Sequence, residues 1–398
     1  MSRSWSRLLL SLPGFLCCVL LLAACDAGRS STPQPTATAG VAVNTTTPSA
    51  VSDAGNIVAI SPMLAARADH SAVLLPNGTV LIAGGCTNVN GCEGGSLSAT
   101  TEIYDPKTGT FRHGPSMTVS RAGDQSATLL PNGLVLIAGG WGARPLASAE
   151  LYNPATETFT PTGSMHVPRA GHTATLLLTG KVLITGGDDG SARQASAELY
   201  DPQTGVFSLT GTMTSPRLGH MAARLSDGRV LITGGDSARG AVLSSAEIYT
   251  PATGAFTRTG NMTVVRYKHA AVTLPNGQVL IIGGADRRDG YGAYASAELY
   301  DPESGTFTAT GSMSASRYKI GAAVALLKNG EVLVAGGGDF VEVYDPQAGA
   351  FKGVAGHIGT ARLFATVAPL PDGTALVTGG YDNSITLTAG AWVYHPGP

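Results

Sequence analysis

One repeated cassette constrains this chain more than any other feature. Residues 164–207 show it in full: an arginine, an apolar run that ends in Gly-Gly, an Ala-Glu-Leu-Tyr-Asp-Pro segment, and a phenylalanine seven residues after the tyrosine. The Gly-Gly pairs recur at 84/85, 139/140, 186/187, 234/235, 283/284, 336/337 and 379/380, so successive copies lie 43 to 55 residues apart. That period, filled with short strands and without helical periodicity, is typical of a β-propeller. The chain after residue 55 is therefore predicted to be all-β with seven blades.

Each copy divides into four predicted antiparallel strands. In the copy at 164–207 they are expected near 172–178, 182–185, 197–200 and 206–210. Runs such as VLIAG and VLITG are apolar at every position, which suits a strand that is covered on both faces by neighbouring blades. The short LPNG and DPxTG segments have the composition of tight turns.

The last copy ends at its third predicted strand, Ala391 to His395, and lacks a fourth. The missing pattern lies at the other end of the chain, where residues 55–63 align with residues 254–262 and place Ile57 at the position of Phe256. We therefore expect residues 55–61 to form the outer strand of the last blade. This closure removes the edge that an open ring of sheets would expose.

These motifs resemble the kelch-repeat family, whose propellers have Gly-Gly after an apolar strand and then two aromatic residues at a fixed spacing. The Tyr/Phe pairs are 104/111, 152/159, 200/207, 249/256, 300/307 and 344/351. The family usually has Trp where this chain has Phe. The resemblance implies a galactose-oxidase-like central propeller over residues 55–398. It implies no single function, because kelch propellers serve as binding modules, scaffolds and occasional enzymes.

Residues 1–24 are predicted to be a signal peptide. Arg3 and Arg7 precede an apolar stretch from Leu8 to Leu22, and the following Ala-Ala-Cys resembles the bacterial lipoprotein box, which implies a lipid on Cys25. An uncleaved membrane helix is the alternative, but the stretch is short and contains Pro-Gly. Residues 25–54 read as the lipidated cysteine and a Ser/Thr/Pro-rich tether. The protein is thus expected at the outer face of the bacterial cell membrane, or at its periplasmic face if there are two membranes.

Two further cysteines, Cys86 and Cys92, lie six positions apart in one predicted loop. In an oxidising compartment two nearby loop cysteines are expected to form a disulfide. A metal site would need additional ligands, and none is adjacent in the sequence.

One arginine opens the first predicted strand of every copy, and a glutamate stands two residues before the repeat tyrosine in six copies. The arginines could form a cationic ring at the channel mouth that attracts an anionic ligand. Their regular recurrence favours structural pairing with the glutamates. They are Arg67, Arg121, Arg169, Arg217, Arg266, Arg317 and Arg362.

Four histidines follow their arginines by three residues: His70, His172, His220 and His269. Asp124, Ile320 and Ala365 are assigned to that position in the other copies. Histidines repeated in this way are interpreted as packed and hydrogen-bonded, in preference to metal ligands. No metal or other cofactor is predicted.

The residues that break the repeat are the better ligand-binding candidates. From the second glycine of each pair to the glutamate position, the spacing varies from 5 to 17 residues, and all these loops are expected on one face. Aromatic side chains beside Arg or Lys suit a carbohydrate or peptide surface. For Tyr267 and Tyr318, packing between blades is an equal alternative. The candidates are Trp141, Tyr267, Arg287, Arg288, Tyr291, Tyr294 and Tyr318.

The predicted function is a lipid-anchored binding or scaffold propeller, expected to be monomeric, that recognises a glycan or protein at the cell surface. A net charge of −2 without a basic block argues against nucleic acid. The alternative is a carbohydrate-active enzyme resembling sialic-acid epimerases. Copper-radical oxidases need a Tyr–Cys thioether and two histidines on copper, and no His-His pair occurs here. No catalytic residue is predicted, because nucleophile elbows, phosphate loops and HExxH motifs are absent.

Overall fold

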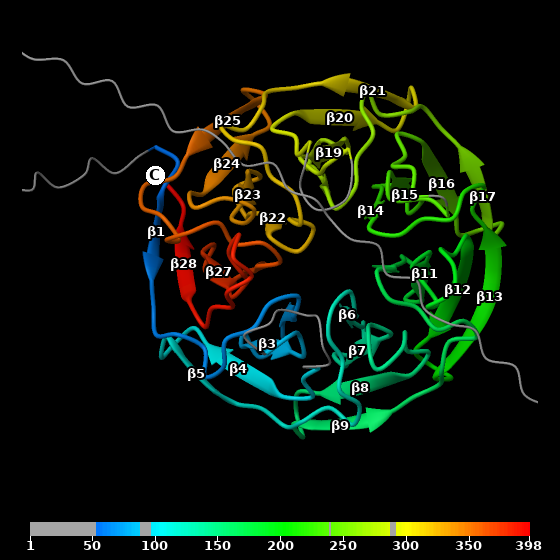
Figure 1. Cartoon of the computed structure of the whole chain (residues 1–398), viewed down its shortest axis with the longest axis horizontal. Helices are drawn as coiled ribbons and strands as arrows, with labels where there is room; N and C mark the ends of the chain where they lie inside the picture. The colour runs from blue at the N-terminus through cyan, green and yellow to red at the C-terminus, as the bar shows by residue number, and fades with distance from the viewer. Residues whose placement is uncertain (1–52, 88–96, 239, 287–291) are drawn as a thin grey trace, which may run out of the picture. The chain divides into compact units, whose positions relative to one another are not determined.

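The computed structural model describes residues 53–87, 97–238, 240–286 and 292–398. These residues form 28 β-strands in seven four-stranded antiparallel sheets, which are the blades of a propeller (Figure 1). Within them, no helix has the length and apolar character needed to cross a membrane. The predicted all-β, seven-bladed architecture is confirmed.

The strands take four positions in each blade, from the central channel outward. The first strands are β2 (Ser71–Leu74), β6 (Ser126–Leu129), β10 (Thr173–Leu176), β14 (Met221–Arg224), β18 (Ala270–Thr273), β22 (Val324–Leu326) and β26 (Thr366–Pro369). The second strands are β3 (Val80–Ala83), β7 (Val135–Ala138), β11 (Val182–Thr185), β15 (Val230–Thr233), β19 (Val279–Ile282), β23 (Val332–Val334) and β27 (Ala375–Thr378). The third strands are β4 (Thr101–Asp105), β8 (Ala149–Asn153), β12 (Ser196–Asp201), β16 (Ala246–Thr250), β20 (Ala297–Asp301), β24 (Glu342–Asp345) and β28 (Ala391–His395). The fourth strands are β5 (Thr110–His113), β9 (Thr158–Pro161), β13 (Val206–Thr212), β17 (Ala255–Arg258), β21 (Thr306–Ala309), β25 (Ala350–Gly353) and β1 (Asn56–Ala59).

The ring closes as the repeat predicts. Strand β1 pairs antiparallel with β28, so the last blade combines one N-terminal strand with three C-terminal ones. Ile57 pairs with Tyr394 in the register that joins Phe256 to Tyr249 in the fourth blade. Each first strand contacts the first strand of the next blade, and β26 contacts β2, which completes the circle.

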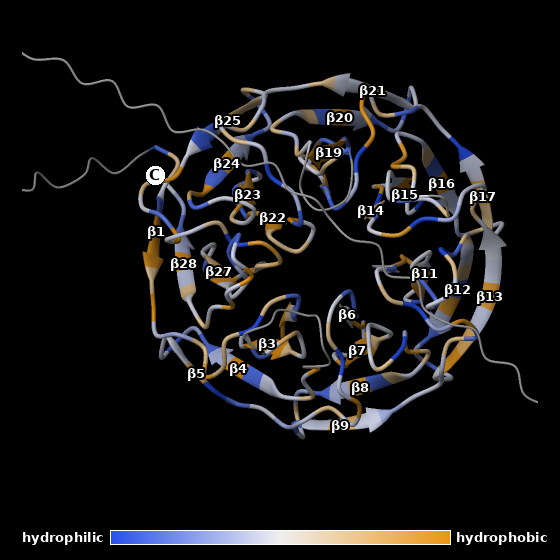
Figure 2. Cartoon of the chain, viewed as in Figure 1, coloured by the Kyte–Doolittle hydropathy of each residue, from blue (hydrophilic) through white to orange (hydrophobic). Residues whose placement is uncertain are grey.

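The hydrophobic core lies between the blades. All residues of the second strands are buried, and alternate residues face opposite neighbours. Val80 and Ile82 pack against the last blade, whereas Leu81 and Ala83 pack against the second. Figure 2 shows the hydrophobic colouring of second strands such as β3 and β7. This double coverage explains why these strands are apolar at every position instead of alternating.

The repeated aromatic pairs hold the outer strands. In the first six blades the Tyr of the third strand lies opposite the Phe of the fourth, with ring centroids 4.8–5.0 Å apart. Several of these tyrosines also bond the preceding blade: the hydroxyl of Tyr200 is 2.9 Å from that of Thr162. In the last blade the Tyr394 hydroxyl donates instead to the carbonyl of Ala54, just before β1. The aromatic repeat therefore stabilises both the blades and the closure.

Candidate ligand site at the mouth of the central channel

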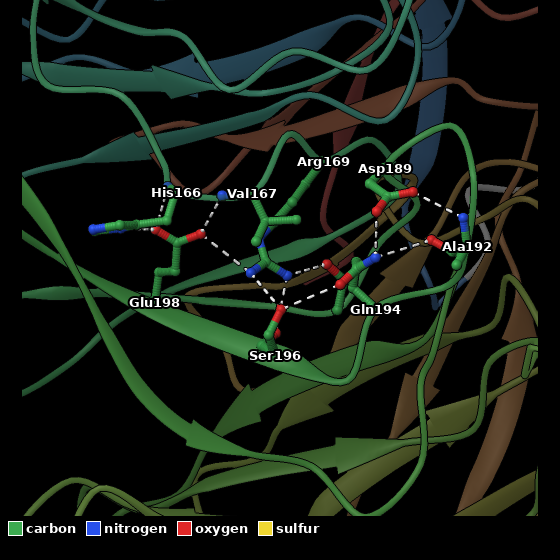
Figure 3. A network of polar contacts seen from close by, with 9 residues as sticks. His166, Val167, Arg169, Asp189, Ala192, Gln194, Ser196 and Glu198 are labelled. Carbon is green, nitrogen blue, oxygen red and sulfur yellow. Dashed lines mark hydrogen bonds and ion pairs between the residues drawn. The ribbon is translucent and has the colours of Figure 1, made fainter.

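Six of the seven repeat arginines are buried inside the blades. Each forms an ion pair with the glutamate of its own blade at 2.6–3.2 Å, and each donates to the carbonyl of the first glycine of the Gly-Gly pair. Figure 3 shows this network for Arg169, Ser196 and Glu198. These six guanidinium groups are therefore engaged within the blades and are not exposed at the channel mouth.

The glutamates also hold the segments that connect the blades. The Glu198 carboxylate accepts the backbone N–H groups of His166 and Val167, which lead into the third blade (Figure 3). Burial alone would raise the pKa of Glu198, but these N–H donors, the His166 ring and Arg169 lower it below its ordinary value. The carboxylate thus remains ionised and fixes the connecting segment.

The seventh arginine differs. Trp392 occupies the glutamate position in the last blade, and Arg362 is half-buried with its guanidinium 5.8 Å from the centre of the Trp392 ring. Arg362 forms no ion pair with any residue that the structure describes. Burial lowers its pKa, against the opposing influence of Asp382.

The four repeat histidines are buried between blades. Their Nε2 atoms lie 2.8–3.1 Å from Ser or Thr hydroxyls of the preceding blade, for example His269 with Thr233 and His172 with Ser126. Burial and the nearby arginines lower the pKa of His70, His172 and His220 to about 3. The histidine side chains are therefore neutral and join neighbouring blades by hydrogen bonds.

From the sequence, Asp124 is expected at the histidine position of the second blade, and this assignment is wrong by one residue. The second blade has an additional residue, Gly123, after its arginine, so Gln125 occupies the histidine position. Gln125 lies against Gly140 as His172 lies against Gly187. Its Nε2 donates to the carbonyl of Ala83. Asp124 is thereby shifted into the ring described next.

Seven residues, one from each blade, form a ring at the start of the first strands. All seven have positive φ, between 51° and 67°. Six links of the ring are backbone N–H to C=O hydrogen bonds between neighbouring blades, and the seventh runs from the Asp124 N–H to the Asp69 carboxylate. In ring order they are Asp69, Asp124, Gly171, Gly219, Lys268, Lys319 and Phe364.

The ring borders a cavity of about 390 Å³ in the central channel. Below the ring the wall consists of the first residues of the inner strands, mostly Ser, Thr, Ala and Gly, with the four histidines and Met221. A volume of this size lies within the range of small-molecule sites. The blades differ in charge at the ring, since it carries two Asp, two Lys, one Phe and two Gly.

The charges of the ring influence one another. Burial and the neighbouring Asp124 raise the pKa of Asp69 from 3.8 to about 7, against the opposing effect of Lys268 and Lys319. Burial would lower the pKa of Lys268, but Asp124, Tyr267 and Asp69 outweigh it and raise the pKa above its ordinary value. Lys268 therefore stays cationic, whereas Asp69 changes charge near neutral pH.

Aromatic rings surround the two lysines. The Lys268 Nζ lies 4.5 Å from the centre of the Phe364 ring, and the Lys319 Nζ lies 5.3 Å from it. Lys319 also bonds the hydroxyl of Tyr381 at 2.9 Å. Ammonium groups over aromatic faces are stabilised by the quadrupole of the ring. Lys268, Lys319, Phe364 and Tyr381 therefore form a wall that is both apolar and cationic.

Two of the predicted binding residues adjoin this wall. Tyr267 is buried, packs against Gly219 of the preceding blade and lies beside Lys268, while Tyr318 is half-buried beside Lys319. Both therefore combine the two interpretations, packing between blades while flanking a cavity lysine.

The other predicted binding residues are more dispersed. Trp141 is 36% exposed, and its ring edge lies close to Gly123 beside the ring. Tyr294 is half-buried, with the Arg266 guanidinium 5.3 Å from its ring. Arg287, Arg288 and Tyr291 lie outside the described residues, as do Cys25 and Cys92. Cys86 is fully buried at the start of its loop.

Asp69, Asp124, Phe364 and Tyr381 are absent from the residues chosen from the sequence. A signal was present, because the position two residues after each arginine changes from Asp to Gly, Lys and Phe along the chain. It is obscured in the second blade by the additional Gly123.

The kelch motif model matches residues 67–118, 125–166 and 168–214. The fold is similar to that of a novel fungal alcohol oxidase of the AA5 family in complex with copper, with 17% identity, a TM-score of 0.70, and coverage of 86% of this chain and 76% of that one. It is also similar to YjhT, with 12% identity, a TM-score of 0.57, and coverage of 83% and 95%. No curated protein sequence matches the chain significantly. At these identities the structural likeness shows the fold alone.

Copper is a ligand of the fungal oxidase, and the residues here do not fit such a centre. Across the described parts of the chain, no group of three or more His, Cys, Asp or Glu side chains is placed to hold a metal ion. The Nε2 atoms of the channel histidines face Ser and Thr hydroxyls of adjoining blades.

Proposed function

We propose that this seven-bladed propeller, whose first three blades match the kelch motif, is a binding module whose ligand contacts the loop face at the mouth of the central channel. The ligand we favour is a glycan or a protein segment displayed at the cell surface. The ring from Asp69 to Phe364 is the centre of this site, and Trp141, Tyr267 and Tyr318 lie around it.

The observation that carries the proposal is the backbone of the ring. Five of its seven residues are not glycine and yet have positive φ, a conformation that costs L-residues about 1 kcal/mol or more each. Gly171 and Gly219 show that glycine is accepted at the same position without this cost. The five residues with side chains thus retain charge and aromatic surface at the cavity despite a local penalty, which is typical of binding sites.

We further propose that the propeller is exported and held at the membrane by a lipid on Cys25. The lipoprotein-like Leu-Ala-Ala-Cys sequence supports the anchor, and the Ser/Thr/Pro-rich residues 26–54 would give the propeller reach toward its ligand. A disulfide between Cys86 and Cys92 is proposed for the same exported compartment.

One observation favours an enzyme as the second candidate. The Asp69 carboxyl, with a pKa of about 7, lies next to Asp124, and such a pair can give and accept a proton near neutral pH. The corresponding activity would be a proton transfer on a carbohydrate bound in the channel.

A glycan array with the purified chain tests the binding proposal, supplemented by pull-down of surface proteins. The variant K268M removes a charge of the ring. The variant K352M removes an exposed lysine of the outer strand β25, which pairs with Asp345 of β24. We expect K268M to lose most of the binding and K352M to retain it. Equal binding by both variants, or no binding to any glycan or protein, would reject the site.

A further inference from the structure

The charges of the ring are segregated around the channel. Asp69 and Asp124 come from the first and second blades, and Lys268 and Lys319 come from the fifth and sixth. Gly171 and Gly219 separate the two groups on one side, and Phe364 separates them on the other. The mouth therefore has an acidic arc and a basic arc on opposite sides of one cavity.

The acidic arc and Lys268 interact electrostatically without forming an ion pair. Asp69, Asp124 and Lys268 form no ion pair within 4 Å with any described residue. The Lys268 Nζ instead lies over the Phe364 and Tyr267 rings. Both carboxylates nevertheless influence the pKa of Lys268, so the arcs are within electrostatic reach of each other. Asp69, Asp124 and Lys268 thus line one cavity without an ion pair among them, and a ligand in that cavity lies within reach of each.

The space between the arcs suits a small molecule. Neither glycine places a side chain there, and the wall below the ring consists largely of small residues such as Ser71, Ala127 and Ala174. A ligand with only a positive or only a negative group would satisfy one arc and lie beside the other arc of like charge. A ligand with both groups would satisfy each arc.

We propose that the channel mouth binds a small zwitterion, with its ammonium group at Asp69 and Asp124 and its carboxylate at Lys268 and Lys319. Phe364 then covers the apolar part of the ligand between the two charges. The inference rests on the binding function proposed above and gives that function a ligand class: free ω-amino acids, or the equivalent pair of groups on a larger molecule.

Isothermal titration of the full-length protein with matched probes tests this at pH 8. The zwitterionic probes are 3-aminopropanoate, 4-aminobutyrate and 6-aminohexanoate, and the single-charge probes are butyrate and butylamine. We expect at least one zwitterion to bind about tenfold or more tightly than either single-charge probe. If butyrate or butylamine binds as tightly as the best zwitterion, the proposal is overturned.

Two variants test which ring residue binds each charged group of the ligand. D124N is expected to weaken the zwitterion about tenfold and to abolish its advantage over butyrate, and K268M is expected to abolish its advantage over butylamine. The controls D345N and K352M make the same changes of charge at an exposed ion pair away from the channel and should bind as the unchanged protein does. Thermal unfolding identifies a variant that does not fold. The comparison of probes on the unchanged protein does not depend on the variants and still tests the proposal.

The outcomes separate this inference from the function on which it rests. If the array detects a glycan that K268M no longer binds, while none of the five probes binds, the zwitterion is rejected and the binding site stands. If neither array nor probes give binding, both are rejected.

Discussion

At the scale of single residues, the channel mouth combines a positive-φ backbone with the charges of Asp69, Asp124 and Lys268, which form no ion pair with any described residue. The six blade interiors show the opposite arrangement, since each buried arginine has a glutamate and carbonyl acceptors. Charged residues are therefore structural where their partners repeat in six blades, and the proposed ligand site lies where the charges do not repeat.

The first prediction concerns Asp69. Its folded pKa of about 7 lies above the ordinary 3.8, so the folded state holds the proton that the unfolded state releases. The contribution of this group is favourable below pH 4 and is lost as the pH rises to 7. We expect D69N to gain roughly 1–3 kcal/mol relative to the unchanged protein between pH 4 and pH 8, measured by denaturant unfolding. A difference that does not change with pH would contradict the burial of this charge.

The second prediction concerns the buried ion pairs. E247Q leaves the Arg217 guanidinium buried without its carboxylate and weakens the acceptor for the Thr214 N–H. We expect a loss of about 3–5 kcal/mol in the free energy of unfolding. The matched change at the exposed Glu303, E303Q, should cost less than about 0.5 kcal/mol. Similar melting curves for the two variants would show that the pair does not stabilise the fold.

What could be predicted from the sequence at this scale depended on repetition. The Tyr/Phe pairs recur at constant spacing and were recognised without coordinates. Asp69 and Asp124 were not, because their importance comes from meeting across blades 55 residues apart in the sequence, and because Gly123 shifts one of them. Phe364 and Tyr381 are single aromatics whose proximity to the lysines arises from the packing of the fifth, sixth and seventh blades around the channel.

At the scale of elements, β1 is the strand that closes the propeller. Its pairing with β28 follows from the alignment of Ile57 with Phe256, which made this contact between the two ends of the chain predictable. The lengths of the loops were also countable from the sequence, but not the direction of their side chains. The ring residues, which lie in the segments that lead into the first strands, also have a positive φ that their residue types do not reveal.

The third prediction tests β1. A chain that begins at residue 63 lacks the partner of β28 and the Ala54 acceptor of Tyr394. The exposed edge of β28 should cause aggregation and a lower melting temperature. A chain that begins at residue 53 keeps these contacts and serves as the control. Equal melting temperatures and equal solubility of the two chains would refute closure by β1.

At the scale of the whole molecule, histidine hydrogen bonds between blades recur around the propeller. The buried histidines join the third blade to the second, the fourth to the third, the fifth to the fourth, and the first to the seventh. Protonation of any of these rings would bury a second cation near a repeat arginine, so the stability of the propeller is coupled to pH at several blade interfaces at once.

The fourth prediction follows from the lowered histidine pKa values. The folded His220 has a pKa of about 3 against an ordinary 6.5, so the unfolded state binds the additional proton. Its contribution is fully present above pH 6.5 and is lost as the pH falls toward 3. We expect H220Q, which copies the native Gln125, to reduce the slope of unfolding free energy against pH by about 1.4 kcal/mol per unit between pH 4 and 6. An unchanged slope would mean that His220 is protonated in the folded protein.

The closure by β1 also has a mechanical consequence. If the chain is anchored through Cys25 as proposed, tension on the anchor reaches the Ala54 carbonyl, which Tyr394 bonds, and then Asn56, which pairs with His395. The load then falls on the bonds of this one short strand, which pairs with β28 and also hydrogen-bonds Ala355 after the outer strand of the sixth blade. The strand that closes the ring is thus also the first element expected to detach under force, and strong pulling would open the propeller at the last blade.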